Sequence, residues 1–299
     1  MTAVSSRPDV SWALIVAPPL LVALVAGALA LRAAFIGGAP DGLTVAAPQT
    51  VLVAPRTYSY RPPGEYTRDG YAVDAPLLTI PVTRPLTIMK YQVSRADYAR
   101  CVGDGACALP EPEHINPGLD NVPATGVSFE DAQAYAAWLG RQTGEFWTLP
   151  TDEQLAFAAG SRFPDDALGT ESSNPADRWL KKYRRETERS VVRDPVPKPL
   201  GHFGDNEFGL ADFGGNVWEW TTTCYRRISP NQVGPADTSP CGVQFVAGQH
   251  RAAMVSFIRN PKGGACAVGA PPENLGFRLV KDTRWYAPLL RALREGFLS

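Results

Sequence analysis

One segment constrains the fold more than any other. Residues 206–220, NEFGLADFGGNVWEW, contain three glycines, three acidic residues, two asparagines and two tryptophans. Glycine and asparagine favour tight turns because they adopt backbone conformations that other residues avoid. Tryptophan instead favours burial. Both kinds of residue within fifteen positions predict a tight turn whose end is anchored in a core.

The rest of the C-terminal half predicts little regular structure. Between Gly201 and Val280 hydrophobic periodicity disappears, and glycines separate short apolar pieces. The chain of 299 residues also has 27 glycines and 28 prolines, which argues against a helical bundle. A hydrophobic content of 44% still supports a packed core. We therefore expect loops joined by brief strands.

Helices are expected upstream and beside this region. Ser128 and Thr151 are typical N-caps, and glycines 144 and 160 end the helices that follow them. A shorter helix is predicted to begin at Ser94, with Asp97 in its first turn. Residues 174–193 mix acidic and basic side chains and predict a solvated helix. The alternative for that helix is a basic docking patch.

The N-terminus predicts a membrane anchor over residues 1–36. Trp12 to Leu31 is uncharged and apolar, and a run of about 20 such residues spans a hydrocarbon layer. A signal peptide cleaved near Ala28 to Ala30 is the alternative. We expect a single-pass protein of the inner membrane with its main domain in the periplasm. Residues 37–76 are predicted as a linker that leads into the first strands.

The five cysteines agree with export to an oxidising compartment. Cys101 and Cys107 bracket a Gly-Asp-Gly turn and are expected to close a small disulfide loop. Of Cys224, Cys241 and Cys266, two are expected to pair and one to remain. Buried free thiols are the alternative. Because there is no CxxC spacing, thioredoxin-type chemistry and a structural zinc are not expected.

Charge and motifs exclude several function classes. With 29 basic and 30 acidic residues, the chain shows no sign of a nucleic-acid partner. Three histidines leave little material for a histidine-based metal centre. His250 beside Arg251 is more typical of a structural histidine than of an acid–base catalyst. No phosphate-binding loop, nucleophile elbow or HExxH motif occurs.

Five segments, in order, resemble the formylglycine-generating enzyme family, also called the sulfatase-modifying factor domain. They are MKYQVSRADYARCV (89–102), PATGVSFEDAQAYAAWL (123–139), TLPTDEQLAFAAG (148–160), the 206–220 turn, and NLGFRLV (274–280). The resemblance covers residues 77–281, and an amphipathic helix is predicted over 282–299. It implies an α+β, C-type-lectin-like fold with little regular secondary structure, here preceded by the predicted transmembrane helix.

The resemblance implies a calcium site in the turn. Carried over by position, Asp212 and Glu219 would supply carboxylate oxygens, and Gly215 and Val217 would supply main-chain carbonyls. Calcium takes roughly six to eight oxygen ligands, so acids on a tightly turning backbone suit it. The alternative is that both acids bond to nearby amides and no ion is held.

The resemblance also implies where catalysis would occur. Active members oxidise a substrate cysteine to formylglycine, and two cysteines with four residues between them hold the copper(I) that the reaction needs. Those positions fall near Ala252 and Phe257, and no cysteine lies within one residue of either. Met254 is the only sulfur in the segment and is typical of core packing. A copper site is therefore not expected.

These observations predict a non-catalytic, exported accessory or maturation factor for another exported protein. The segment TCYRR…CGV is similar to one in accessory proteins encoded with copper nitrite reductases. One alternative is an active copper-dependent oxidase that acts on a cysteine of a secreted protein through Cys241 or Cys266. The other is a lectin-like module that binds a ligand.

Overall fold

The computed structural model describes residues 45–111, 119–169, 174–190, 194–228, 241–264, 272–284 and 286–287. All of its helices and strands belong to one compact unit, Ala47–Ser299. The predicted anchor over residues 1–36 and most of the predicted C-terminal helix lie outside the described residues. Among those that are described, no helix has the length and hydropathy needed to cross a membrane.

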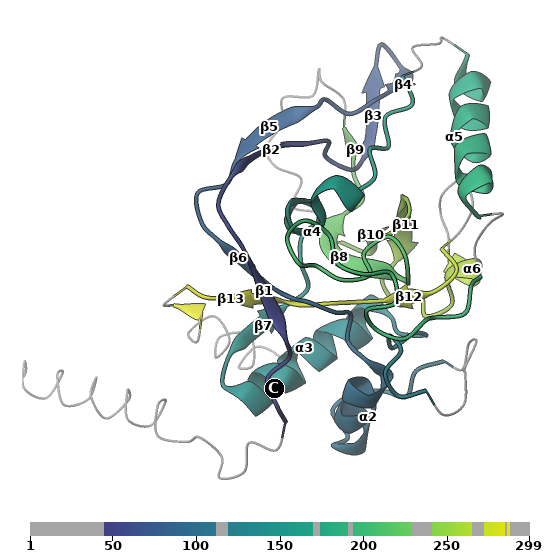
Figure 1. Cartoon of the computed structure of the whole chain (residues 1–299). Coiled ribbons are helices and arrows are strands. Elements are labelled where there is room, and N and C mark those ends of the chain that lie inside the picture. The colour runs from purple at the N-terminus through teal and green to yellow at the C-terminus, as the bar shows by residue number, and fades with distance from the viewer. Residues whose placement is uncertain are drawn as a thin grey trace, which may run out of the picture. The chain divides into compact units, whose positions relative to one another are not determined.

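Two four-stranded sheets form the centre of this unit (Figure 1). The first is antiparallel and has the order β1 (Thr50–Val53), β6 (Leu86–Met89), β13 (Val280–Asp282) and β7 (Phe146–Thr148). The second has the order β11 (Arg251–Val255), β10 (Val243–Ala247), β8 (Trp218–Cys224) and β12 (Leu275–Gly276). In that sheet β12 is parallel to β8. Each sheet is therefore completed by residues from the last tenth of the chain.

Two smaller sheets lie beside them. One pairs β2 (Thr57–Tyr60) with β5 (Leu78–Pro81), and the other has the order β4 (Tyr71–Val73), β3 (Glu65–Arg68), β9 (Arg227–Ile228). The sequence prediction assigned residues 37–76 to a linker leading into the first strands, whereas β1 to β4 already occupy residues 50–73. Alternation of apolar or aromatic residues with polar ones, as in TYSY, is enough for strands because distant segments pair with them.

The helices confirm the predicted caps. In α2 (Arg95–Gly103) Ser94 accepts a hydrogen bond from the Asp97 N–H. Both α3 (Phe129–Thr143) and α4 (Asp152–Ala159) begin with a capping box, at Ser128 and Thr151 respectively. A 3₁₀ turn, η1 (Gly160–Arg162), follows α4. The predicted solvated helix is α5 (Pro175–Ser190), and α6 (Pro261–Gly264) is a single turn.

The core joins the sheets through α4. Leu155, Phe157 and Ala158 of α4 pack against Val53 and Ile88 of the first sheet, together with Leu210, Phe213, Ala247 and Val280. The cluster thus includes two residues of the 206–220 turn. Burying this much apolar surface is the main favourable contribution to folding.

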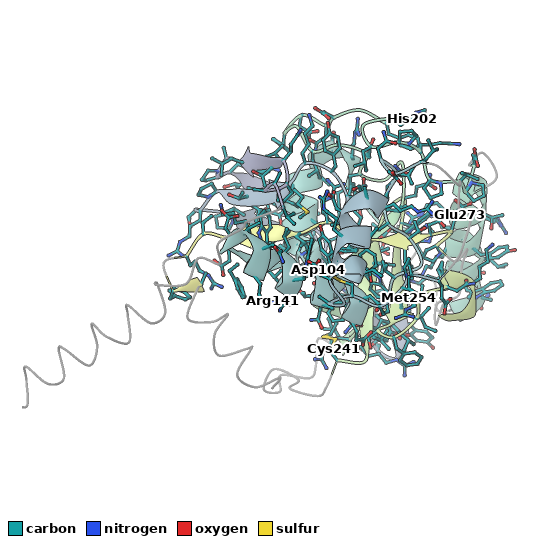
Figure 2. The ribbon with its side chains drawn as sticks, turned by 90° about the horizontal axis from the view of Figure 1, so that it is seen from below. Asp104, Arg141, His202, Cys241, Met254 and Glu273 are labelled. Atoms are coloured by element: carbon teal, nitrogen blue, oxygen red, sulfur yellow. A yellow bond between two sulfur atoms is a disulfide. The ribbon has the colours of Figure 1, made fainter. Side chains whose placement is uncertain are left out.

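Two disulfides close local loops. Cys101 pairs with Cys107, as predicted, and Cys224 pairs with Cys241, which resolves which two of the three remaining cysteines pair. Cys266 lies outside the described residues. Figure 2 shows Cys241 at the margin of the folded unit.

Candidate functional site

Asparagine side chains hold the backbone of the 206–220 turn. The Asn206 Oδ1 accepts hydrogen bonds from the N–H groups of Phe208 and Leu210, and its Nδ2 donates to the Ala158 carbonyl of α4. The Asn216 Oδ1 accepts a hydrogen bond from the Lys198 N–H at 3.0 Å, and its Nδ2 donates to the Lys198 carbonyl at 2.8 Å. These amides hold the part of the segment that precedes β8, where no strand supplies backbone partners, which is why the turn needs them.

Tryptophans anchor the end of the turn as β8 begins. Trp218 and Trp220 are buried, and each indole N–H finds a carbonyl: Trp218 donates to His250 and Trp220 to Val127, both at 2.9 Å. Burial of a large ring whose N–H is satisfied is strongly favourable. His250 is itself buried, and its ring packs edge-on against Trp218 at 5.2 Å between centroids.

Two of the three acids of the turn, Asp212 and Glu219, are fully buried and bonded. Asp212, with a left-handed φ of 62°, accepts hydrogen bonds from the N–H groups of Gly201 and Phe203 at 2.5 and 2.8 Å. Glu219 forms a bidentate pair with buried Arg278, at 2.5 and 2.6 Å, and also accepts from Gln92 at 2.8 Å. The sequence predicted the first kind of bond as an alternative but did not reveal Arg278 as a partner.

Arg278 is bonded at all three of its nitrogens. Beyond Glu219, its Nη1 donates to the Lys90 carbonyl and its Nη2 donates to the Ala211 carbonyl, both at 2.9 Å. The guanidinium thereby joins the first sheet, the turn and the second sheet. A buried charge is stable only when it is paired and bonded in this way.

A second buried ionic cluster lies at the start of β11, and sequence reasoning missed it. Arg251 pairs with Asp152 at 3.1 Å and with Asp166 at 2.6 Å. The Tyr60 hydroxyl donates to the same Asp152 oxygen at 2.7 Å. Burial alone would lower the pKa of Arg251, but the two carboxylates outweigh it and raise that pKa. Burial next to Asp152 also raises the pKa of Tyr60.

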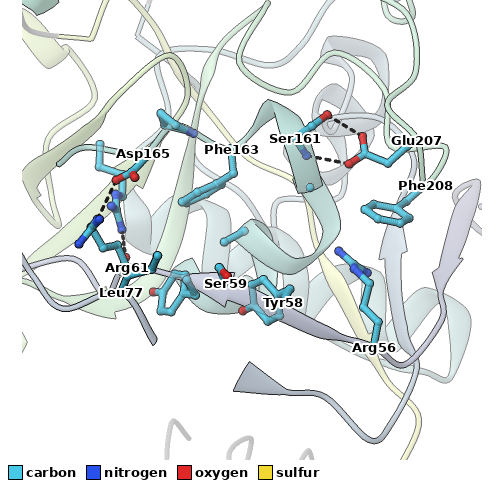
Figure 3. A pocket seen from close by; sticks show the side chains of 15 residues that line it. Arg56, Tyr58, Ser59, Arg61, Leu77, Ser161, Phe163, Asp165, Glu207 and Phe208 are labelled. Atoms are coloured by element: carbon cyan, nitrogen blue, oxygen red, sulfur yellow. Dashed lines mark hydrogen bonds and ion pairs between the residues drawn. The ribbon is translucent and has the colours of Figure 1, made fainter. Parts of the chain in front are cut away.

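A cavity of about 430 Å³ opens beside this cluster (Figure 3). Residues 56–61, which include β2, line one side, and residues 160–165 line the other. An ion pair of Arg61 with Asp165 stands at one end, and at the other the Glu207 carboxylate accepts hydrogen bonds from the N–H and hydroxyl of Ser161. Between them the lining is mostly aromatic and apolar, with Phe163, Tyr58 and Leu77. Five charged side chains also line it, so the cavity is more polar than a typical ligand pocket, which is largely apolar with few polar groups.

Comparison with known proteins gives this arrangement a family. Residues 39–283 match the family model of the sulfatase-modifying factor enzyme 1-like domain. The chain belongs to this family. The match includes the strands of residues 50–73, and the helices and the turn that the resemblance rested on.

Relatives within the sulfatase-modifying factor family include both active and inactive proteins by name. The chain is 33% identical over 150 residues to the formylglycine-generating enzyme of Mycobacterium tuberculosis. This alignment covers 48% of this chain and 46% of the relative. It is 30% identical over 163 residues to the inactive C-alpha-formylglycine-generating enzyme 2 of Bos taurus, covering 52% and 49%. The chain thus spans about half the length of these relatives.

One solved structure supports the fold. The structure of PvdO from Pseudomonas aeruginosa matches with a TM-score of 0.50 and 21% identity, covering 79% of this chain and 95% of that one. At this identity the likeness concerns the fold alone. The mixed helix and strand architecture expected from the sequence is therefore confirmed.

The family's calcium ligands do not fit an ion in the arrangement observed. Both oxygens of Glu219 face a guanidinium, and both oxygens of Asp212 accept main-chain N–H groups. Calcium needs about six to eight oxygens, and a neighbouring fixed cation repels it. The predicted ligands Gly215 and Val217 lie in the same turn, and no group of three or more acidic, histidine or cysteine side chains suited to a metal occurs among the described residues. Calcium binding remains a prediction, and these contacts argue against it.

The copper positions of the family hold no thiol. Ala252 is buried in β11, and Phe257, which follows the strand, is 71% exposed. Met254 between them is fully buried, as expected of a core residue. Cys224 and Cys241, the cysteines nearest in sequence on the N-terminal side, are joined to each other. Within the described part of the chain, no residue at these positions fits copper(I), which selects thiolates.

Proposed function

We propose that this chain is a non-catalytic member of the sulfatase-modifying factor family that binds another exported protein and assists its maturation. One observation carries the proposal. At the position where the resemblance places the second copper thiolate, the chain presents the phenyl ring of Phe257, 71% exposed. A reactive sulfur is replaced there by an apolar surface.

The backbone around Phe257 is fixed, so its ring is presented by a rigid frame. The Ser256 N–H donates to the Gly242 carbonyl, and the Ser256 carbonyl accepts from the Phe129 N–H at the start of α3. The Ile258 N–H donates back to Val255. An exposed aromatic side chain on a rigid support is the usual anchor of a protein interface, because little entropy is lost when it is covered.

Two further observations support an exported, accessory role. Relatives from Bos taurus and Mus musculus carry the name of an inactive formylglycine-generating enzyme. The two disulfides, Cys101–Cys107 and Cys224–Cys241, suit an oxidising compartment such as the periplasm. Together with the predicted N-terminal anchor, these observations support an inner-membrane protein whose main domain binds an exported partner. In its most specific form, the proposal places the chain in the subgroup of accessory proteins associated with copper nitrite reductases.

Capture of the partner tests the proposal. The full chain and its Phe257→Ser variant are used as bait in a periplasmic extract of the source organism. Leu52→Ser is the matched control, because Leu52 is also a highly exposed apolar residue, at 67%, but belongs to the first sheet. We expect the Phe257→Ser bait to capture at least ten-fold less partner than the unmodified chain, and the Leu52→Ser bait to capture as much as the unmodified chain. Equal capture by all three baits contradicts the proposal.

A copper(I) titration of the reduced chain separates this role from catalysis. We expect no thiol-dependent binding that competes with a copper(I) chelator. Tight binding that disappears in a Cys241→Ser/Cys266→Ser variant would instead revive the oxidase with displaced thiols. In that case a cysteine-containing peptide should be converted to the formylglycine product.

Ligand binding is the second candidate, and the cavity beside Arg251 favours it. Its volume suits a small molecule or a short peptide segment. A thermal-shift screen with sugars and short peptides tests it. A shift that is absent from a Leu77→Trp variant, which narrows the cavity from its exposed rim, would support this role.

A further inference from the structure

The helix α5 is attached to the rest of the unit by its basic side. Arg178 pairs with Asp74 at 2.6 Å, and Arg185 donates to the carbonyls of Asp166 and Ala167 at 2.9 and 2.8 Å. The helix lies at the outer edge of the unit, beside β3 and β4, and contacts β4 (Figure 1). A surface helix normally turns its polar side to water. In α5, by contrast, charged residues face the rest of the unit and hold the helix to it.

The opposite side of α5 is apolar and exposed. Trp179, Leu180 and Tyr183 are 44%, 38% and 45% exposed. At about 100° per residue, these three side chains fall within an arc of roughly 100°. The two rings stack on each other, 5.5 Å apart and within 5° of parallel. An amphipathic helix that directs its apolar stripe outward is expected to pack against something.

The exposed charges next to this stripe balance each other. Asp177, Lys181, Arg184 and Glu188 are exposed and lie within an arc of about 60° on one flank of the stripe. Two are acidic and two are basic, so the flank carries no net charge. An anionic membrane or a strongly acidic protein would therefore gain little from this flank, although α5 as a whole has more basic than acidic residues. A surface with the same mixture of charges is complementary to it.

We propose that α5 is a homodimer interface, in which it packs antiparallel against α5 of a second copy of this chain. A two-fold axis level with Lys181 places Trp179 opposite Tyr183 of the other copy, because each lies two residues from the axis. The two Leu180 side chains then meet across the axis. Such a closed contact, in which one patch meets itself, is the commonest way that identical chains associate.

The same axis pairs the flanking charges. Asp177 lies four residues before Lys181 and Arg184 three residues after it. With a rise of about 1.5 Å per residue, Asp177 and Arg184 of the other copy differ in height by only about 1.5 Å. In an antiparallel pair the same flank of each helix adjoins, so two Asp177–Arg184 ion pairs form. Lys181 lies on the edge of the flank farthest from the stripe, so its side chain stays in water.

The interface is small, so the dimer is expected to be weak. One helix face is well below the ~800 Å² per partner of a standard interface. We expect a dissociation constant on the order of tens to hundreds of micromolar. The proposal stands independently of the accessory role, since it rests on α5 and not on Phe257.

Sedimentation equilibrium of the full chain in density-matched detergent tests the dimer, because only protein mass is then measured. Asp177→Arg and Arg184→Asp each place like charges together twice, and each should weaken association at least ten-fold. The double variant Asp177→Arg/Arg184→Asp exchanges the partners of both pairs and should restore it to within about three-fold. Lys262→Asp, an exposed charge reversal on α6, is the control and should change nothing.

Removal of the ring gives a second readout that leaves the charges intact. Trp179→Ser should abolish association while circular dichroism shows unchanged helix content. A monomer up to about 500 µM overturns the proposal. Failure of the double variant to restore association also overturns it. So does the finding that lipid vesicles, and not a second copy of the chain, shield Trp179 from a fluorescence quencher.

Discussion

The buried pair of Arg278 and Glu219 gives the most demanding prediction. Both side chains have no exposed surface, and their separation is 2.5 and 2.6 Å along two parallel contacts. Arg278→Met preserves length and apolar volume but leaves the Glu219 carboxylate with Gln92 as its remaining side-chain partner. Breaking a buried pair in this way costs about 3–5 kcal/mol of unfolding free energy. The Lys90 and Ala211 carbonyls also lose a donor.

The loss should appear in the unfolding midpoint. For a unit of this size, about 2–4 °C of midpoint corresponds to each kcal/mol, so Arg278→Met should lower the midpoint by roughly 6–20 °C. Tryptophan fluorescence follows the transition, because Trp218 and Trp220 flank Glu219. Arg227→Met is the control: its pair with Glu65 is bonded at 2.9 Å, but the arginine is 80% exposed. An exposed pair contributes about 0–1 kcal/mol.

A double variant separates the charge from the packing. Glu219→Met/Arg278→Met removes both charges, and it should cost less than Arg278→Met alone because no charge is left buried without a partner. The reasoning is refuted if Arg278→Met costs no more than Arg227→Met. It is also refuted if the cost of the double variant equals the sum of the two single ones.

Three other predictions concern ions, pH and disulfides. Millimolar calcium should leave the midpoint unchanged, because Arg278 occupies both oxygens of Glu219; an increase of several degrees would restore the family's calcium site. Burial alone would raise the pKa of Asp74, but hydrogen bonds from the N–H groups of residues 168 and 169 and from Arg178 lower it below the usual 3.8. The stabilisation by the Asp74 carboxylate is therefore present above pH 3.8 and is lost as the pH falls through the lowered pKa. In a series of urea-unfolding experiments at different pH values, Asp74→Asn should cost roughly 1 kcal/mol of unfolding free energy at about pH 7 and nothing at the acid end. Serine pairs should cost about 2 kcal/mol at Cys101–Cys107 and about 3 kcal/mol at Cys224–Cys241 by urea unfolding, since the sequence separations are 6 and 17; the reverse order would contradict the loop-entropy reasoning.

Local chemistry could be predicted from the sequence, and it was confirmed where one residue acts on the next few. Ser128 caps α3 through a box closed within three residues. Cys101 and Cys107 pair across a short turn. The 206–220 turn was recognised because its asparagines, glycines and tryptophans each serve a nearby backbone or core position.

Long-range partners could not be predicted. Arg278 and Glu219 are 59 residues apart, and Arg251 and Asp152 are 99 apart, so no periodicity connects them. The strands of residues 50–73 were expected only as lead-in to the domain because their partners, such as β6 and β9, lie far along the chain. The anchor, the periplasmic location and the exported partner remain predictions.

The position of the last strands has a consequence for how the chain is made. β13 lies between β6 and β7, and β12 extends the sheet of β8, while Arg278 connects the two sheets. A nascent chain that ends before Leu275 therefore has an unfilled gap in one sheet and an unpaired Glu219 in the core. Folding must wait until residue 282 has left the ribosome, and contacts so distant in sequence form slowly. Until then the edges of β6, β7 and β8 are open to other chains. The protein is expected to need a chaperone during synthesis, and any truncation upstream of residue 282 should yield an aggregate and not a smaller folded domain.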